Sequence, residues 1–380
     1  MEYILLGLFF IILFVFSYYF KLSYVFFSII LAVIFGIIYM FFLRNYFDLN
    51  VFYNIKNNFS FFYENVFIFL FFYLGLGYNF NKIYKILLKS ISPSLLDLIN
   101  LIVPFLLFFA IFRDFFIAFI FSLIIYPSST AIIVKKLENY KLLFSKQADF
   151  LLGVLLFEDI VLILALSFIS TKKFALSYFL IGIILFFITI LFLNKIFNKY
   201  KKNIELILDS DLGIFLIFGI LLFTTWLFYQ VFYLPYFISS FVLGLSLGEY
   251  LADKIRLKID VFKDLALSSF MFLFFFDSIL NQKEISFLFN EYLVLILAII
   301  LLFLKLLTTY IGAKNFGVSK KNLFNVSFLS LIRGEFSIVA VSFIPKYFLL
   351  ALVIVIFTNL LATLFFYLFY NPKTELSINK

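Results

Sequence analysis

The chain has 380 residues, of which 65% are hydrophobic and 13% are charged, whereas soluble proteins have about 45–50% apolar and about 25% charged residues. This composition excludes a large water-soluble domain, because a folded domain of this length cannot bury so much apolar surface in its own core. The absence of cysteine and histidine excludes disulfide bonds, thiolate metal sites and histidine acid–base chemistry, and the 30 basic against 21 acidic residues leave a formal charge of +9.

Apolar segments long enough to cross a bilayer follow one another along the whole chain. Since a membrane helix needs about 20 apolar residues, the sequence predicts an all-α integral membrane protein with about thirteen transmembrane helices. In chain order, the predicted spans lie near residues 2–20, 22–43, 63–80, 94–112, 115–134, 150–170, 174–194, 212–231, 234–251, 265–281, 290–312, 323–345 and 347–370. The first is too long for a signal-peptide core and is expected to remain in the mature protein.

The connections between these spans predict one membrane domain and its orientation. No connection is long enough for a separate domain, so residues 1–370 are expected to form one transmembrane domain, followed by a short tail over 371–380. Lysine and arginine gather on one side of the spans, in the connections near 135–146, 195–202 and 254–263. Because basic loops stay inside the cell, this asymmetry predicts a multi-pass cell-membrane protein with the C-terminus cytoplasmic and the N-terminus outside. The excess positive charge therefore orients helices and does not indicate nucleic-acid binding.

The fifth predicted span is interrupted by polar residues. Pro127 removes a helix hydrogen bond and is expected to break the helix, and Ser128, Ser129 and Thr130 follow it. The freed carbonyls and the three hydroxyls supply oxygen ligands of the kind that a cation site requires, and half-helix ends add partial charges. The alternative is an ordinary kinked helix in which the hydroxyls bond back to their own carbonyls.

Two adjacent acids occupy the middle of the sixth predicted span. Glu158 and Asp159 lie about halfway along residues 150–170, which at 1.5 Å of rise per residue is near the bilayer midplane. Ionisable groups at this depth are costly and usually functional. The pair predicts an ion- or proton-binding site, with a purely structural buried ion pair as the alternative.

Basic residues inside later spans could balance these acids. Lys305 lies within 290–312 and Arg333 within 323–345, where Glu335 follows it. Lys305 could instead extend its amine to the cytoplasmic interface. Arg333 and Glu335 could form a structural pair, although a spacing of two points side chains apart on a helix and favours unwinding at Gly334. The interrupted fifth and twelfth spans are an odd number of spans apart, which is typical of the inverted repeats of secondary transporters.

The ordered motifs resemble the monovalent cation:proton antiporter-2 family, which includes Kef-type and sodium/proton exchangers. The matching residues are Ser128–Ala131, Gly153 to Ile160, Phe71–Leu76, Leu234–Pro235 with Gly244–Glu249, Lys305 and Arg333–Ser337. The resemblance implies an inverted-repeat fold with two crossed broken helices, a dimerisation bundle and a mobile core bundle, and hence a homodimer. It departs from the family at Gly77, where many members have glutamate, and at Asp277, in a stretch usually free of charge.

The resemblance also assigns roles to the polar residues. Asp159 matches the aspartate that carries the ion and the proton, so the transported Na⁺ or K⁺ is expected to bind there, with no cofactor. Position 158 varies in the family, and Glu158 is expected to pair with Lys305. Proton and dehydrated cation would then compete for Asp159, and cation entry could break the Glu158–Lys305 pair and release a further proton from Lys305. Alternating access would couple the two fluxes.

Two other classes of protein remain as alternatives. A gated monovalent cation channel for K⁺ efflux, without proton coupling, would use the same polar residues, but the sequence has no threonine-valine-glycine-tyrosine-glycine filter. A membrane-embedded enzyme would need acids on two facing helices, whereas Glu158 and Asp159 are adjacent on one. The sequence therefore favours an antiporter that is not an enzyme.

Overall fold

The computed structural model describes residues 60–76, 80–139, 145–170, 213–232, 235–248, 289–341, 343–344 and 347–369, with isolated positions at 11–38, 142, 184–200 and 259–276. Over these residues the chain is helical and contains no strand, as the composition predicts. The chain divides into two compact units, Met1–Phe80 with Ile163–Glu284 and Asn81–Leu162 with Ile285–Lys380. We call these unit 1 and unit 2.

Unit 1 is built around two helices in close contact, α4 (Ser60–Leu76) and α13 (Tyr236–Leu247), with α12 (Gly213–Phe232) against α13. The approach depends on glycine. A Cβ at Gly75 would collide with the carbonyl oxygen of Phe241, and one at Gly244 would collide with that of Phe72. Small residues of this kind let two membrane helices pack backbone against backbone.

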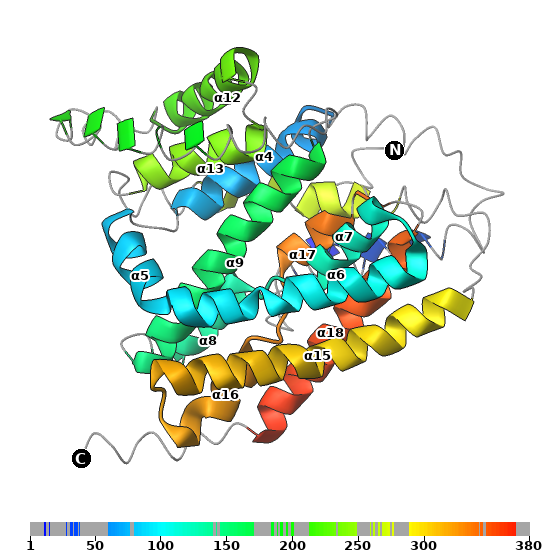
Figure 1. Ribbon diagram of the computed structural model, residues 1–380. Coiled ribbons are helices and arrows are strands. Elements are labelled where there is room, and N and C mark those ends of the chain that lie inside the picture. The colour runs from blue at the N-terminus through cyan, green and yellow to red at the C-terminus, as the bar shows by residue number, and fades with distance from the viewer. Residues whose placement is uncertain are drawn as a thin grey trace. The chain divides into compact units, whose positions relative to one another are not determined.

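Unit 2 contains the longest helices that the structure describes. Helix α5 (Phe80–Asp97) is followed by α6 (Ile99–Phe112), and α15 (Phe289–Phe316) lies alongside α6 (Figure 1). Leu88–Phe112 and Tyr292–Phe316 are each long and apolar enough to cross a membrane. Residues 81–93, expected to connect two spans, belong instead to α5; their polar and apolar residues alternate with helical spacing, a pattern that a search for fully apolar segments misses.

Two helices of unit 2 are interrupted. Helix α7 (Phe115–Ile125) ends before Pro127 and α8 begins at Thr130 (Thr130–Asn139), as the proline predicts. Within the predicted span 323–345, α16 (Leu323–Leu329) and α17 (Glu335–Val341) leave a non-helical segment over 330–334.

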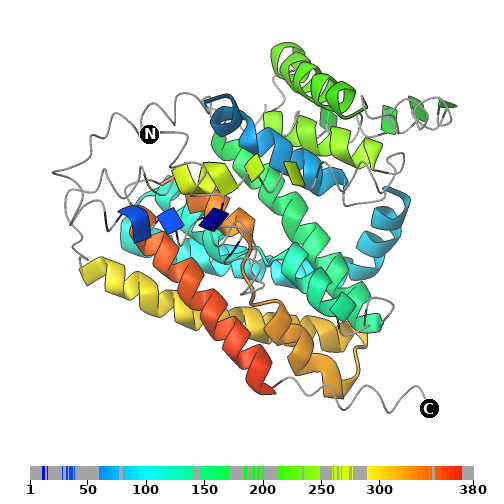
Figure 2. The ribbon, with the colours of Figure 1, turned by 180° about the vertical axis from the view of Figure 1, so that it is seen from behind.

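The remaining helices of unit 2 surround its apolar core. Helix α9 (Lys146–Ser170) belongs to unit 2 as far as Leu162, and α18 (Phe348–Phe369) lies alongside α15 and α16 (Figure 2). Helix α15 ends at Phe316, and the next residue, Gly317, has a positive φ of 87°. This turn lets the Gly317 amide donate to the Lys314 carbonyl and the Val318 amide donate to the Ala313 carbonyl. The core joins α8, α9, α15 and α16 through Ile133, Leu137, Leu151, Leu155, Leu302, Val326 and Leu329.

Candidate functional site: a buried charge cluster at two helix breaks

The two helix breaks of unit 2 touch each other. The Ser129 amide donates a hydrogen bond to the Ile332 carbonyl over 2.7 Å, and the Ser128 hydroxyl donates to the Ser330 carbonyl, also over 2.7 Å. A Cβ at Gly334 would lie 2.9 Å from the Cβ of Ser129. Backbone groups freed by one break therefore find hydrogen-bond partners in the other. The close approach of these two segments leaves room only for glycine at position 334.

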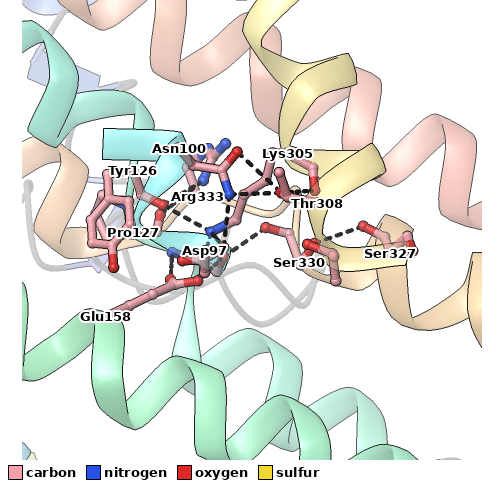
Figure 3. A network of polar contacts seen from close by, with 12 residues as sticks. Asp97, Asn100, Tyr126, Pro127, Glu158, Lys305, Thr308, Ser327, Ser330 and Arg333 are labelled. Carbon is pink, nitrogen blue, oxygen red and sulfur yellow. Dashed lines mark hydrogen bonds and ion pairs between the residues drawn. The ribbon is translucent and has the colours of Figure 1, made fainter. Parts of the chain in front are cut away.

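Glu158 on α9 binds the first break. Its Oε2 accepts from the Ser128 amide over 2.5 Å, and its Oε1 lies 3.2 Å from the Ser128 hydroxyl, which shares its one hydrogen between this oxygen and the Ser330 carbonyl (Figure 3). The side chain is 1% exposed. A buried carboxylate needs such donors, because its ionised form is otherwise strongly destabilised away from water.

Lys305 on α15 lies between two carboxylates. Its Nζ is 2.6 Å from Oε1 of Glu158 and 2.8 Å from Oδ1 of Asp97, and it also donates to the Tyr126 carbonyl over 3.3 Å (Figure 3). Lys305 is 1% exposed. The alternative in which its amine extends to the membrane interface is therefore wrong, and the pairing with Glu158 that the resemblance implies is present.

Asp97 is a member of this cluster that the sequence analysis missed. It is the last residue of α5, is 3% exposed, and its Oδ1 also accepts from Asn100 Nδ2 over 2.8 Å. Asn100 in turn donates to the Thr308 hydroxyl over 2.8 Å. The only signal in the sequence is an acid one turn inside the predicted span 94–112 with an amide three residues later, and a charge so near a span end is ordinarily tolerated.

Asp159 faces a different partner from its neighbour. The Thr130 hydroxyl, at the start of α8, donates to Asp159 Oδ2 over 3.1 Å, and Asp159 is 1% exposed. Glu158 therefore binds the break itself and Lys305, whereas Asp159 binds the first turn of the helix that follows the break. The positive end of a helix dipole favours an anion at that place.

Arg333 binds the carbonyl end of α7. Its Nη1 donates to the Tyr126 and Pro127 carbonyls over 3.1 Å and 3.2 Å, and the residue is 1% exposed (Figure 3). The last carbonyls of a helix have no partners within it and carry partial negative charge, so a guanidinium suits this position. Tyr126 O thus accepts from both Lys305 and Arg333.

The structure brings together most of the residues that the sequence singles out. Unit 2 places the following at or beside the two breaks: Ser128, Ser129, Thr130, Glu158, Asp159, Lys305 and Arg333. The backbone of Glu335 begins α17, but its side chain lies outside the described residues, as do Gly77 and Asp277. Within the part of the chain that the structure describes, no three acidic side chains gather closely enough to ligate a metal ion together.

Comparisons with known proteins all find similarity to cation/proton exchangers and antiporters. Residues 5–370 match the family model described as the transmembrane region of sodium/hydrogen exchangers. The chain is 29% identical over 286 residues to the K(+)/H(+) antiporter subunit KhtU of Bacillus subtilis, covering 72% of this chain and 68% of that protein. It is 25% identical over 285 residues to the ammonium/H(+) antiporter subunit AmhT of Alkalihalophilus pseudofirmus, covering 72% of each.

A solved structure shares the fold. The sodium proton antiporter MjNhaP1 of Methanocaldococcus jannaschii, determined at pH 8, superposes with a TM-score of 0.61 over 96% of each chain, at 15% sequence identity. The all-helical arrangement is therefore that of a known antiporter structure.

Proposed function

We propose that this chain, which belongs to the sodium/hydrogen exchanger family, is a secondary antiporter that exchanges Na⁺ or K⁺ for H⁺ by alternating access. The family assignment confirms the resemblance of its motifs, and two relatives are named as antiporter subunits, which does not favour the channel alternative. The observation that carries the proposal is the pair of buried acids, Glu158 and Asp159, bound to a broken helix inside unit 2.

Asp159 is the proposed carrier of both substrates. A proton or a dehydrated cation neutralises its carboxylate, and because the two compete for one group, release of one accompanies binding of the other. The Thr130 hydroxyl, 3.1 Å from Asp159, is placed to donate to the empty carboxylate and to turn its oxygen towards a bound cation. Ser128 and Ser129, in the preceding helix break, are proposed to provide further hydroxyl oxygens to the cation.

The basic residues have a separate proposed role. Lys305 and Arg333 balance the buried acids and the carbonyl end of α7, so that the empty site does not carry the full charge of its carboxylates. Glu335 belongs to the same proposed charge balance at the start of α17.

The whole-chain features of the proposal come from the sequence and the family. We expect about thirteen membrane spans, with α7–α8 and α16–α17 as the two crossed broken helices. Residues 1–370 form the membrane domain of a homodimer in the cell membrane, and residues 371–380 form a short cytoplasmic tail. The N-terminus lies outside the cell, and no cofactor is required.

The test measures proton movement in everted membrane vesicles loaded with a pH-sensitive dye. Addition of Na⁺ or K⁺ should restore the dye fluorescence in vesicles with the wild-type chain. Asp159→Asn should abolish the response to every cation. Asp114→Asn, at the exposed N-cap of α7, makes the same chemical change away from the site and should leave the response intact.

The same vesicles separate the antiporter from the channel alternative. Cation uptake in the wild type without any proton movement would favour a channel. Full exchange activity in Asp159→Asn would exclude Asp159 as the carrier while leaving the antiporter assignment in place.

A further inference from the structure

We propose that a cluster of lysines at the end of α15, together with an exposed apolar stripe on that helix, binds an anionic phospholipid of the cytoplasmic leaflet. Such a site is separate from the exchange reaction, because none of its residues belongs to the buried charge cluster described above. It depends only on the proposed topology, which places the connection after α15 in the cytoplasm.

The lysine cluster lies where α15 ends. Lys314 is in the last turn of α15, and the short helix η2 (Lys320–Asn322), which leads into α16, contributes two more lysines. Lys146, the first residue of α9, reaches the same place, because a Cβ at Gly317 would lie 2.7 Å from its Nζ. The lysine cluster thus has four members, all exposed: Lys146, Lys314, Lys320 and Lys321.

No described carboxylate neutralises the lysine cluster. Within the part of the chain that the structure describes, none of the four ammonium groups forms an ion pair, and the exposed Asp149, one turn into α9, is not paired with Lys146. Lys146 and Lys314 complement the carbonyl end of α15, which carries partial negative charge. Lys320 and Lys321 lie beyond that helix end, so their positive charge is available to an anion from outside the chain.

An exposed apolar stripe leads along α15 to the lysine cluster. Leu307 and Ile311 are four residues apart and exposed, and Lys314 continues the same face one turn later. The exposed ring of Phe324 on α16 widens this stripe, because its centroid lies 5.1 Å from that of Tyr310. An acyl chain that lies along the stripe brings its headgroup to the lysines.

The combination of these two surfaces selects the chemistry of the ligand. A phosphodiester headgroup carries a negative charge and accepts several hydrogen bonds, which suits a group of ammonium donors. A soluble anion would leave the apolar stripe unused, and a phospholipid without net charge would leave the lysines uncompensated. Clusters of about four to eight basic residues directly on the cytoplasmic side of a membrane helix are typical of sites for anionic lipids.

The experiment titrates lipid into the chain purified in detergent and follows its melting temperature. Phosphatidylglycerol should raise the melting temperature, and phosphatidylcholine with the same acyl chains should raise it less. Glycerophosphoglycerol, the same headgroup without acyl chains, should give no shift. An equal shift with phosphatidylcholine would show that the negative charge is not recognised, and an equal shift with glycerophosphoglycerol would show a site for a soluble anion. Either result would overturn the proposal.

Lys320→Gln together with Lys321→Gln tests the lysine cluster. The amount of phosphatidylglycerol needed for half of the shift should rise roughly thirtyfold, as expected when two basic residues beside an anionic lipid are lost. The same two positions changed to arginine keep the charge and should behave as wild type. Lys195→Gln together with Lys199→Gln, at exposed positions of unit 1, removes the same net charge and should leave the amount unchanged. Equal weakening by the two glutamine pairs would show a response to total charge alone and would contradict a site.

Ile311→Asn tests the apolar stripe. It should weaken the effect of phosphatidylglycerol, whereas Ile296→Asn, equally on an exposed face of α15 but about 22 Å away along the helix, should not. The same effect from both changes would count against the stripe as part of the site. The vesicle assay reports on the proposed function separately. Proton-coupled exchange without any selective lipid shift would reject the lipid site alone, and a selective lipid shift without any exchange would reject the antiporter function alone.

Discussion

At the scale of single residues, two adjacent carboxylates in unit 2 acquire different environments from two hydroxyl residues. Ser128 donates to Glu158 through both its amide and its hydroxyl, whereas Thr130 donates to Asp159. Glu158 is also paired with Lys305. These environments suit a structural role for Glu158 and an ion-exchanging role for Asp159. Glu158 is already paired with the Lys305 ammonium, so binding a cation would stabilise it less.

Thr130 provides a test of this division. Thr130→Val keeps the shape of the side chain but removes the hydroxyl oxygen that is proposed to turn towards the bound cation, so the KM for the transported cation should rise roughly fivefold, as expected for the loss of a polar contact worth about 1 kcal/mol. Thr130→Ser keeps the hydroxyl and serves as the control. The measurement is cation-dependent dye recovery in everted vesicles. Equal KM values for the wild type and the valine variant would show that this hydroxyl plays no part in cation binding.

At the scale of elements, the site depends on the contact between two interrupted helices. The backbone bond from Ser129 to Ile332 joins the α7–α8 break to the α16–α17 break, and Arg333 from the second break binds the carbonyls that α7 leaves open. Each break thus satisfies polar groups that the other exposes. Buried backbone groups without such partners would be expensive inside a membrane.

Gly334 is the position at which this contact can be disturbed with the smallest change. In Gly334→Ala the new Cβ would lie 2.9 Å from both Cβ and Oγ of Ser129, so the two breaks must separate. We expect loss of most exchange activity and a lower melting temperature in detergent. Gly219→Ala on α12 is the control, because a Cβ there meets nothing within 4 Å. Identical melting curves and activities for the two alanine variants would contradict a tight contact at Gly334.

At the scale of the whole molecule, the basic residues predict how the chain crosses the membrane. The chain contains no cysteine, so single introduced cysteines report their side without background. Ser377→Cys in the tail should react with a membrane-impermeant maleimide only when the cytoplasmic face is accessible, and Lys56→Cys only from outside the cell. Labelling of both from the same side would contradict an odd number of spans, and labelling from the reversed sides would contradict the orientation.

The sequence by itself determined the class of the protein and proposed most members of the candidate site. Apolar segments of bilayer length give an all-helical membrane protein, because the bilayer demands internally satisfied backbone. Charges in the middle of predicted spans identify Glu158, Asp159, Lys305 and Arg333 as candidate site residues. A charged side chain at this depth costs free energy, and such residues are usually functional. The break at Pro127 follows from the chemistry of proline alone. All of these are local signals, which can be read without knowing which helices are neighbours.

Only the tertiary structure decided which charges meet. Asp97 lies near the end of an apolar segment, where a charged side chain costs little free energy and attracts no notice in the sequence. Its place in the cluster comes from its contact with Lys305, 208 residues away in sequence. Arg333 likewise binds the carbonyls of Tyr126 and Pro127, which belong to the other helix break. The physical reason is that the free energy of a buried charge depends on its partners across helix contacts, and those contacts are fixed by packing and not by local pattern.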